Sequence, residues 1–192
     1  MARRRYYRRS VRVVPAKKKW ASNIVQYTMR QGRPNAGGGP IGNFITLVSN
    51  SASNSTPTPV IIKTGNFKVS VDAVSQLNIS EVSSVNVIVF VAFLPEGYSY
   101  STTSADSGAD LMKAHPEWIM AWKQIDFTSA TGTATNNSAT ANFSSRLKRN
   151  LNSGDKIIVG TAYPAAEVKP SPDSQGNLFT YTVACQYWTC AN

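Results

Sequence analysis

Residues 67–74 read FKVSVDAV, an alternation of apolar and polar side chains. The apolar residues at the odd positions from Phe67 to Ala73 would share one face of a β-strand. A second stretch, VNVIVFVAFL at residues 85–94, is apolar on both faces except at Asn86. Such a stretch is typical of a central strand that is covered on both sides. Together the two stretches predict a β protein with a well-buried sheet.

Further strand candidates follow on both sides of these stretches, separated by turn residues. Val and Ile number 28 against 7 Leu, a β-branched bias that suits strands better than helices. Residues 118–127 fit a strand or a helix, and we choose the strand because a helix would stand alone among β elements. The predicted strands cover residues 22–30, 41–48, 59–63, 67–74, 85–94, 118–127, 139–146, 156–163 and 178–188.

The number and spacing of these strands predict the fold class. Eight or nine strands without a βαβ rhythm indicate an all-β protein, and 192 residues suit one such domain. A single eight-stranded jelly roll, a two-sheet antiparallel sandwich, covers both inner faces and is favoured. An immunoglobulin-like sandwich fits less well, because its Cys–Trp–Cys spacing is absent. In the last strand, the expected core face holds Phe179, Tyr181, Val183, Cys185 and Tyr187.

A helical turn or two is predicted at residues 110–114. It should end before His115, because a residue that precedes proline avoids the helical conformation.

The net charge of +10 is concentrated near the N-terminus. Residues 1–33 hold eleven Lys and Arg and no acid, whereas the other 159 residues hold nine Lys and Arg and all ten acids, a net charge of −1. A near-neutral body therefore carries a cationic segment. Contact with a polyanion is expected to be made by this segment.

The first twenty residues, MARRRYYRRSVRVVPAKKKW, are predicted to form a disordered arm, with the jelly-roll domain at residues 21–192. Arginine forks bind phosphate bidentately, and tyrosines between arginine pairs can stack on unpaired bases. A nuclear-import signal or a solubility tail is the alternative interpretation of these cations, and import is compatible with nucleic-acid binding. The predicted nucleic-acid-binding residues are Arg3, Arg4, Arg5, Tyr6, Tyr7, Arg8, Arg9, Arg12, Lys17, Lys18 and Lys19.

A second basic cluster consists of Arg146, Lys148 and Arg149. We expect it to straddle a strand end, where it would extend a basic inner surface; ordinary surface charge explains it equally well. The four tryptophans exceed what a small core needs, so some are expected to anchor subunit contacts. Core packing is the alternative for each of them. They are Trp20, Trp118, Trp122 and Trp188.

No pattern in the sequence points to an enzyme, a cofactor or a metal site. The run GGGP at residues 37–40 lacks the ending and the following helix of a phosphate-binding loop, so a flexible connector is preferred. His115 has no neighbouring Cys or His, and we expect a loop or interface residue. Paired acids for glycoside hydrolysis are a remote alternative. The acids considered are Asp106, Asp110, Glu117 and Asp126.

Neither a disulfide nor membrane insertion is expected. Cys185 and Cys190 lie in one extended segment, with Cα atoms about 16 Å apart, against the roughly 4.4–6.8 Å of a disulfide. Free thiols favour an intracellular site of synthesis. The longest apolar run, Val87–Leu94, has eight residues, far short of the about twenty that a membrane helix needs.

An MARRRYYRRS terminus before a neutral body of jelly-roll size resembles the capsid proteins of small circular single-stranded DNA viruses, the circovirus-like group. Two internal stretches strengthen this resemblance: HPEWIMAWK at residues 115–123 and SSRLKRNLNSGDKI at residues 144–157. The chain is shorter than typical circovirus capsid proteins, which implies trimmed surface loops.

The resemblance implies that about sixty copies form an icosahedral T=1 shell, with one jelly roll in each subunit. The arms would point inward and bind a single-stranded DNA genome through phosphate contacts and base stacking, without reading its sequence. The implied locations are the virion and, during assembly, the host-cell nucleus. Partners would be further copies of the chain, the genome and a nuclear import receptor, and the sequence does not define the host receptor.

Two other classes of function stay open from the sequence. One is a non-viral nucleic-acid-binding β-domain protein with a basic tail. The other is a jelly-roll enzyme or carbohydrate binder with an incidental tail. Closed, uniform particles would distinguish a capsid protein from both.

Overall fold

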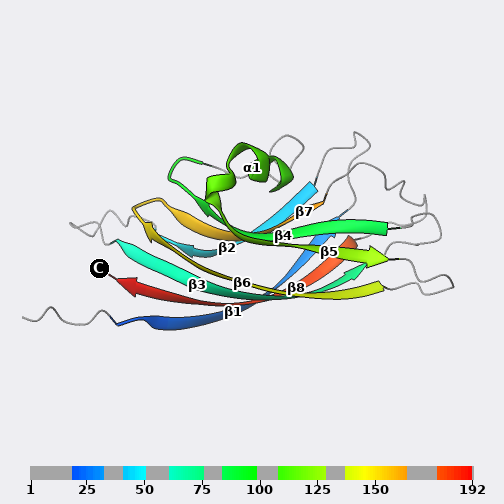
Figure 1. Cartoon of the computed structure of the whole chain (residues 1–192), viewed down its shortest axis with the longest axis horizontal. Coiled ribbons are helices and arrows are strands. Elements are labelled where there is room, and N and C mark those ends of the chain that lie inside the picture. Colours follow the sequence, from blue (N-terminus) through cyan, green and yellow to red (C-terminus); the bar gives the residue numbers. More distant parts are fainter. Residues whose placement is uncertain are drawn as a thin grey trace, which may run out of the picture.

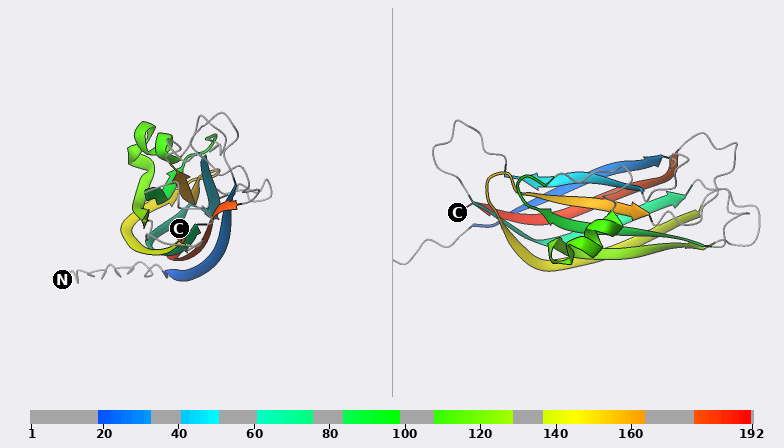
Figure 2. Two further views of the ribbon diagram at one scale, coloured as in Figure 1. Left: turned by 90° about the vertical axis from the view of Figure 1, so that its right-hand side faces the viewer. Right: turned by 90° about the horizontal axis from the view of Figure 1, so that it is seen from above.

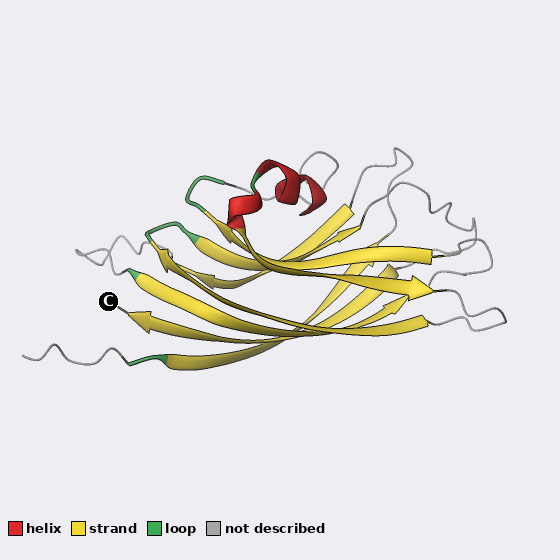
Figure 3. Ribbon diagram, viewed as in Figure 1, coloured by secondary structure: helices red, strands yellow, loops and turns green. Residues whose placement is uncertain are grey.

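The computed structural model describes residues 19–32, 41–50, 61–75, 84–98, 108–128, 137–163 and 177–191. These residues are mostly strands, with one α-helix and one 3-10 helix between β4 and β5 (Figures 1 and 3). The strands are β1 (Ala21–Gly32), β2 (Ile41–Ser49), β3 (Ile62–Ser75), β4 (Ser84–Leu94), β5 (Ile119–Thr128), β6 (Asn137–Leu151), β7 (Lys156–Tyr163) and β8 (Asn177–Ala191). The helices are α1 (Gly108–Ala114) and η2 (Pro116–Trp118).

The strands form two four-stranded sheets, in the orders β1-β8-β3-β6 and β2-β7-β4-β5. All pairings are antiparallel. Each sheet draws strands from both halves of the chain, as the jelly roll requires. Figure 2 shows the two layers packed face to face, with the helices outside the layer that contains β4 and β5. The predicted all-β class and eight-stranded jelly roll are confirmed.

The core between the sheets follows the alternation seen in the sequence. In β3 the apolar side chains from Phe67 to Ala73 are at most 3% exposed, while Lys68 and Asp72 face solvent. The odd-numbered residues 181–187 of β8 are buried opposite them, as predicted. The side chain of Phe179, predicted on the same face, lies outside the described set. The polar residues of β3 and β8 therefore form the outer surface of this sheet.

Strand β4 is covered on both sides, as its apolar sequence predicts. Val87, Val89 and Val91 belong to the core between the sheets. On the opposite face, Phe90 packs in a second cluster with Leu111 of α1. The helix covers this sheet, so the other sheet keeps the more open outer surface.

The strand boundaries differ from the prediction in two places. Residues 62–63 and 67–74, predicted in separate strands, belong to one strand, β3, whose register shifts at Gly65, while residues 59–60 of the first prediction lie outside the described residues. Strand β6 runs on to Leu151, so the second basic cluster lies inside the strand and not at its end, and that prediction is wrong. The strand tolerates this charge because alternate side chains face solvent. The predicted strand at residues 118–127 is confirmed as β5, while Trp118 belongs to η2.

A buried carboxylate ties three connections together at one end of the sandwich. Asp155, which is 5% exposed, accepts hydrogen bonds from the backbone N–H groups of Glu96 (2.9 Å) and Asn152 (2.8 Å). Its backbone carbonyl accepts another from the N–H of Asn50 (2.9 Å). These contacts join the turn between β6 and β7 to the residues that follow β2 and β4.

The two cysteines are free, as predicted, and both are buried, although burial was predicted only for Cys185. No helix among the described residues is long and apolar enough to cross a membrane. The glycine run at residues 37–40 and Asp106 lie outside the described residues.

Candidate nucleic-acid interface

The predicted arm meets the folded body at Lys19 and Trp20, which are both exposed. The other predicted arm residues, from Arg3 to Lys18, lie outside the described residues. Trp20 leads directly into β1, whose first residue, Ala21, pairs with Thr189 at the end of β8. The arm is therefore attached where the start of β1 and the end of β8 lie side by side (Figure 1).

Cations gather on the outer surface of the β1-β8-β3-β6 sheet, at the same end as this attachment point. In β6, Lys148 pairs with Gly65 and Asn150 pairs with Lys63, while the neighbouring Leu151 is in the core. Because paired residues of an antiparallel sheet point to the same side, Lys148 and Lys63 face outward. We define the basic face as Lys63, Lys68, Arg146 and Lys148, together with Trp20 and Trp188.

Glycine at position 65 makes room for a side chain that crosses the sheet. A Cβ atom there would lie 2.6 Å from Cγ of Lys148 and 2.8 Å from the carbonyl oxygen of Leu147. The Lys148 side chain therefore passes over Gly65, and its Nζ lies 5.3 Å from the centre of the Trp20 ring. This cation–π contact joins β6 to Trp20, the last residue of the predicted arm.

The second basic cluster does not act as a unit, because the pleat of β6 separates its members. Arg149 lies opposite the buried Thr64 and points to the other side of the strand from Lys148. Its guanidinium lies 5.5 Å from the centre of the Phe93 ring and donates a hydrogen bond to the backbone carbonyl of Glu117. Arg149 thus ties the end of β6 to β4 and η2, whereas Arg146 and Lys148 stay on the basic face.

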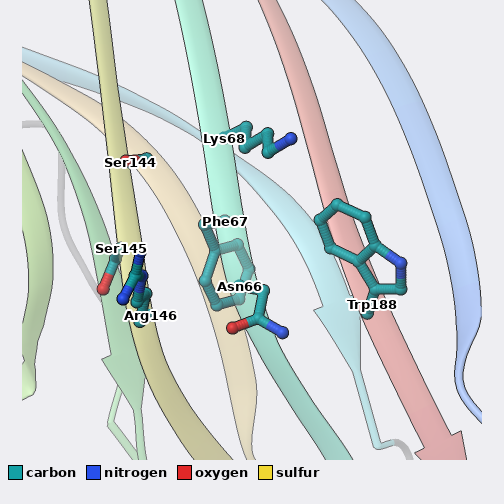
Figure 4. A pocket seen from close by; sticks show the side chains of 7 residues that line it. All are labelled: Asn66, Phe67, Lys68, Ser144, Ser145, Arg146 and Trp188. Carbon is teal, nitrogen blue, oxygen red and sulfur yellow. The ribbon is translucent and has the colours of Figure 1, made fainter.

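A shallow hollow of about 360 Å³ opens on the basic face beside Trp188 (Figure 4). It lies where the register of β3 shifts, at Asn66, which has a left-handed backbone with φ of 55°. Nζ of Lys68 lies 5.7 Å from the centre of the Trp188 ring. The lining residues are Asn66, Phe67, Lys68, Ser144, Ser145, Arg146 and Trp188.

Acidic groups are sparse on this surface. Among the described residues, Asp72 is the acid on the same face of β3, four residues beyond Lys68 and so about 13 Å away. Its carboxylate accepts a hydrogen bond from the hydroxyl of Thr140 (2.9 Å). The ion pair among the described residues is His115–Glu117, which lies on the other sheet, so the cations around the hollow have no carboxylate of the described chain within ion-pair distance.

Sequence reasoning missed Lys63, Lys68 and the hollow, and placed Trp188 only as a contact or core residue. A signal for Lys68 was present, because the alternation at residues 67–74 already puts it on the solvent side. Nothing in the sequence indicated that Gly65 lets Lys148 reach the arm, since that contact depends on the pairing of β3 with β6.

His115 lies between α1 and η2, in a loop position as predicted. Its ring stacks on Trp118, with centroids 3.7 Å apart and planes 7° from parallel, and its Nδ1 lies 3.1 Å from Oε1 of Glu117. The pKa of the Glu117 carboxyl is lowered by a hydrogen bond from the backbone of Glu117 and by one from the side chain of His115. Glu117 is exposed, while His115 and Trp118 are half-buried, and all three lie outside the other sheet, away from the basic face.

The remaining acids give no metal or catalytic arrangement in the described part of the chain. No group of three His, Cys, Asp or Glu side chains there could hold a metal ion. The carboxylate of Asp126 accepts a hydrogen bond from Gln124 (2.6 Å) at the surface. The side chain of Asp110, another acid considered from the sequence, lies outside the described set.

No protein-family model matches this chain, and no curated protein does. Among solved structures, the chain is similar to one from the empty head of turnip yellow mosaic virus, with 12% identity, a TM-score of 0.31, and coverage of 97% of this chain and 89% of that one. It is also similar to a chain of Desmodium yellow mottle tymovirus, with 10% identity, a TM-score of 0.28 and coverage of 88% of each chain. These TM-scores are too low to support an argument, so the assignment of the fold depends on the strand order of this chain.

Proposed function

We propose that this chain is the coat subunit of a virus, with a structural and non-catalytic role, and that it packages single-stranded DNA through its basic N-terminal arm. Copies of the jelly-roll body at residues 21–192 build an icosahedral T=1 shell. Residues 1–20 act as a flexible tether that holds the genome inside it. The observation that carries this proposal is the attachment of the cationic arm beside the basic face of a body that is otherwise near neutral.

The distribution of charge supports this division of labour. The nine cations of residues 1–20 bind phosphates without sequence preference and release counterions as they do so. Subunits held on one strand are then at high local concentration, where weak apolar contacts between bodies suffice for closure. Exposed apolar side chains that can form such contacts are present on several strands: Ile24 (73% exposed), Trp122 (54%) and Leu147 (52%).

The circovirus-like group is the proposed affiliation, on the sequence stretches quoted above. In that case the arm first carries the protein into the host-cell nucleus, and later the virion contains it. A fluorescent reporter fused to residues 1–33 should enter the nucleus. A reporter that stays in the cytoplasm would remove this part of the proposal and leave the packaging role standing.

The test of the main proposal is the purified full-length protein in the electron microscope. We expect closed, uniform particles that contain nuclease-protected single-stranded DNA when assembled in its presence. A protein that stays monomeric or dimeric at every concentration and ionic strength, yet binds DNA, would instead support the non-viral nucleic-acid-binding alternative.

A second measurement assigns DNA binding to the arm. A variant that begins at Lys19 should lose salt-sensitive binding to single strands and keep the circular dichroism spectrum of a β protein. Unchanged binding in a folded truncated variant would place the main site on the body and would contradict the packaging arm.

A further inference from the structure

We infer that the hollow beside Trp188 is a nucleotide subsite, in which the indole stacks on an unpaired base of single-stranded DNA while Arg146 and Lys68 bind the flanking phosphates. This inference rests on the proposed function and adds a contact on the body to the contact made by the arm.

The position of the hollow suits a strand that comes from the arm. The hollow and Trp20, the last residue of the arm, both lie on the basic face, at the end of the sheet where β1 begins. Lys148, which contacts the Trp20 ring, lies two residues beyond Arg146 on the same side of β6. A DNA segment held by the arm would therefore leave it across Lys148 and reach the hollow directly.

The hollow has the size and lining that one nucleotide needs. Its volume of about 360 Å³ falls in the range of roughly 300–1,000 Å³ of small-molecule sites. Trp188 gives one apolar face, while Asn66 and Ser144 bring polar groups to the lining (Figure 4). Bases of any identity have a face for stacking, so the subsite would read no sequence.

The two cations lie on one side of Trp188, Lys68 on the adjacent strand and Arg146 on the next, where they could bind successive phosphates of a strand whose base stacks on the indole. Lys68 comes from β3 and Arg146 from β6, so they approach the hollow from neighbouring strands. The Lys68 ammonium now lies over the indole, in a contact that is weaker at an exposed site than base–aromatic stacking. An entering base would replace it there, and the flexible lysine stem would let the ammonium follow the phosphate.

The combination of charge and aromatic surface favours single-stranded DNA over an acidic peptide as the occupant. An acidic peptide would use the cations and leave the indole without a partner. A single strand uses both, because its bases are unpaired and its phosphates recur along the chain.

Photochemical cross-linking of the full-length protein tests the inference. The probe is a twenty-nucleotide oligothymidylate that contains 5-iodouracil, followed by peptide mapping. We expect two groups of cross-links, one in residues 1–20 and one at Trp188. Cross-links in the arm alone would refute the subsite and leave the packaging arm intact, whereas their absence from both regions would contradict the proposed function as well.

A double variant, Lys68→Gln with Arg146→Gln, should lower the Trp188 cross-link yield about fivefold or more while the arm cross-links persist. The matched control is Lys113→Gln with Lys123→Gln, which removes the same charge from α1 and β5. An equal loss in both double variants would show a general charge effect and would refute the subsite.

Two competition and salt measurements complete the test. An abasic oligonucleotide of the same length should compete poorly for the Trp188 cross-link, and so should polyglutamate; competition as strong as that of oligothymidylate would show an unspecific anion surface. The slope of log K against log salt should fall by about 0.7 for each phosphate that the Lys68/Arg146 variant no longer binds. An unchanged slope would count against phosphate binding by this pair.

Discussion

Replacement of Asp155 by Ala should destabilise the fold more than any other single change of a described acidic side chain. The carboxylate is 5% exposed and satisfies the backbone N–H groups of Glu96 and Asn152, at 2.9 and 2.8 Å. Without it, both donors lose a charged acceptor, and because Glu96 and Asn152 are exposed residues with part-buried hydrogen bonds, water replaces that acceptor only in part. The loss should therefore exceed that of an ordinary surface hydrogen bond.

The expected magnitude follows from these two donors. A hydrogen bond to a carboxylate contributes about 1–2 kcal/mol when its donor is only partly buried, so the loss of two should lower the free energy of unfolding of Asp155→Ala by about 2–4 kcal/mol. Asp155→Asn keeps one carbonyl acceptor and turns an NH₂ group toward the other N–H, so it should cost about half as much. In a chain of this length each kcal/mol shifts Tm by about 2–4 °C, which makes the alanine variant easy to distinguish.

Thermal unfolding followed by circular dichroism, at one protein concentration and in one assembly state, gives the measurement. Asp126→Ala is the matched control, because that carboxylate is exposed and bonds only to a side-chain amide of Gln124 in the described contacts. It should change the free energy of unfolding by no more than about 0.5 kcal/mol. Equal Tm values for the two alanine variants would refute the role assigned to Asp155.

Three further changes probe the core. Gly160→Ala would place a Cβ 2.6 Å from the buried Phe90 ring and should cost about 1–3 kcal/mol, measured as a lower Tm; an unchanged Tm would mean that the ring moves freely. Tyr187→Phe removes a buried hydrogen bond from the hydroxyl to the carbonyl of Leu47 (2.9 Å) and should cost about 0.5–1.5 kcal/mol in urea unfolding, without loss of assembly. Burial raises the pKa of the Cys185 thiol from 9.0 to about 12. As the pH rises, the thiol therefore loses its proton in the unfolded chain before it does so in the folded one. Between these two pKa values the free energy of unfolding should fall by about 1.4 kcal/mol per pH unit. Cys185→Ala should show a shallower fall over the same range, and identical slopes would contradict this origin.

The fold could be predicted because its main signals are local. The alternation at residues 67–74 and the doubly apolar stretch at residues 85–94 each report how many faces of a strand are buried, and the structure agrees with both. The ends of strands were harder to predict. Polar residues at a solvent-facing position neither favour nor oppose a strand, so the extension of β6 to Leu151 depends on pairing with β3, which sequence does not display.

The basic face could be predicted only in part, for the same reason. Sequence proximity grouped Lys148 with Arg149, yet consecutive residues of a strand point to opposite sides. Lys68 and Lys148 are eighty residues apart and meet on one surface because β3 and β6 are neighbours. The hollow exists because the register of β3 shifts at Gly65 and Asn66, both in its pairing with β6 and in its pairing with β8.

A near-neutral body has a physical consequence for the proposed shell. At a contact between neighbouring subunits, charges lie within a few ångströms of one another. This separation is shorter than the Debye length of about 8 Å at physiological ionic strength, so salt does not screen them. Had the eleven cations of residues 1–33 been spread over the body, they would repel at every contact between copies. Confined to an arm and one face, they leave the sides of the sandwich to apolar contacts, which salt does not weaken. High salt should therefore release DNA and still permit closed particles, which the ratio of absorbance at 260 and 280 nm together with electron microscopy would show. Dissociation of the shell at the same salt concentration that releases DNA would mean instead that the genome, and not contact between bodies, holds the subunits together.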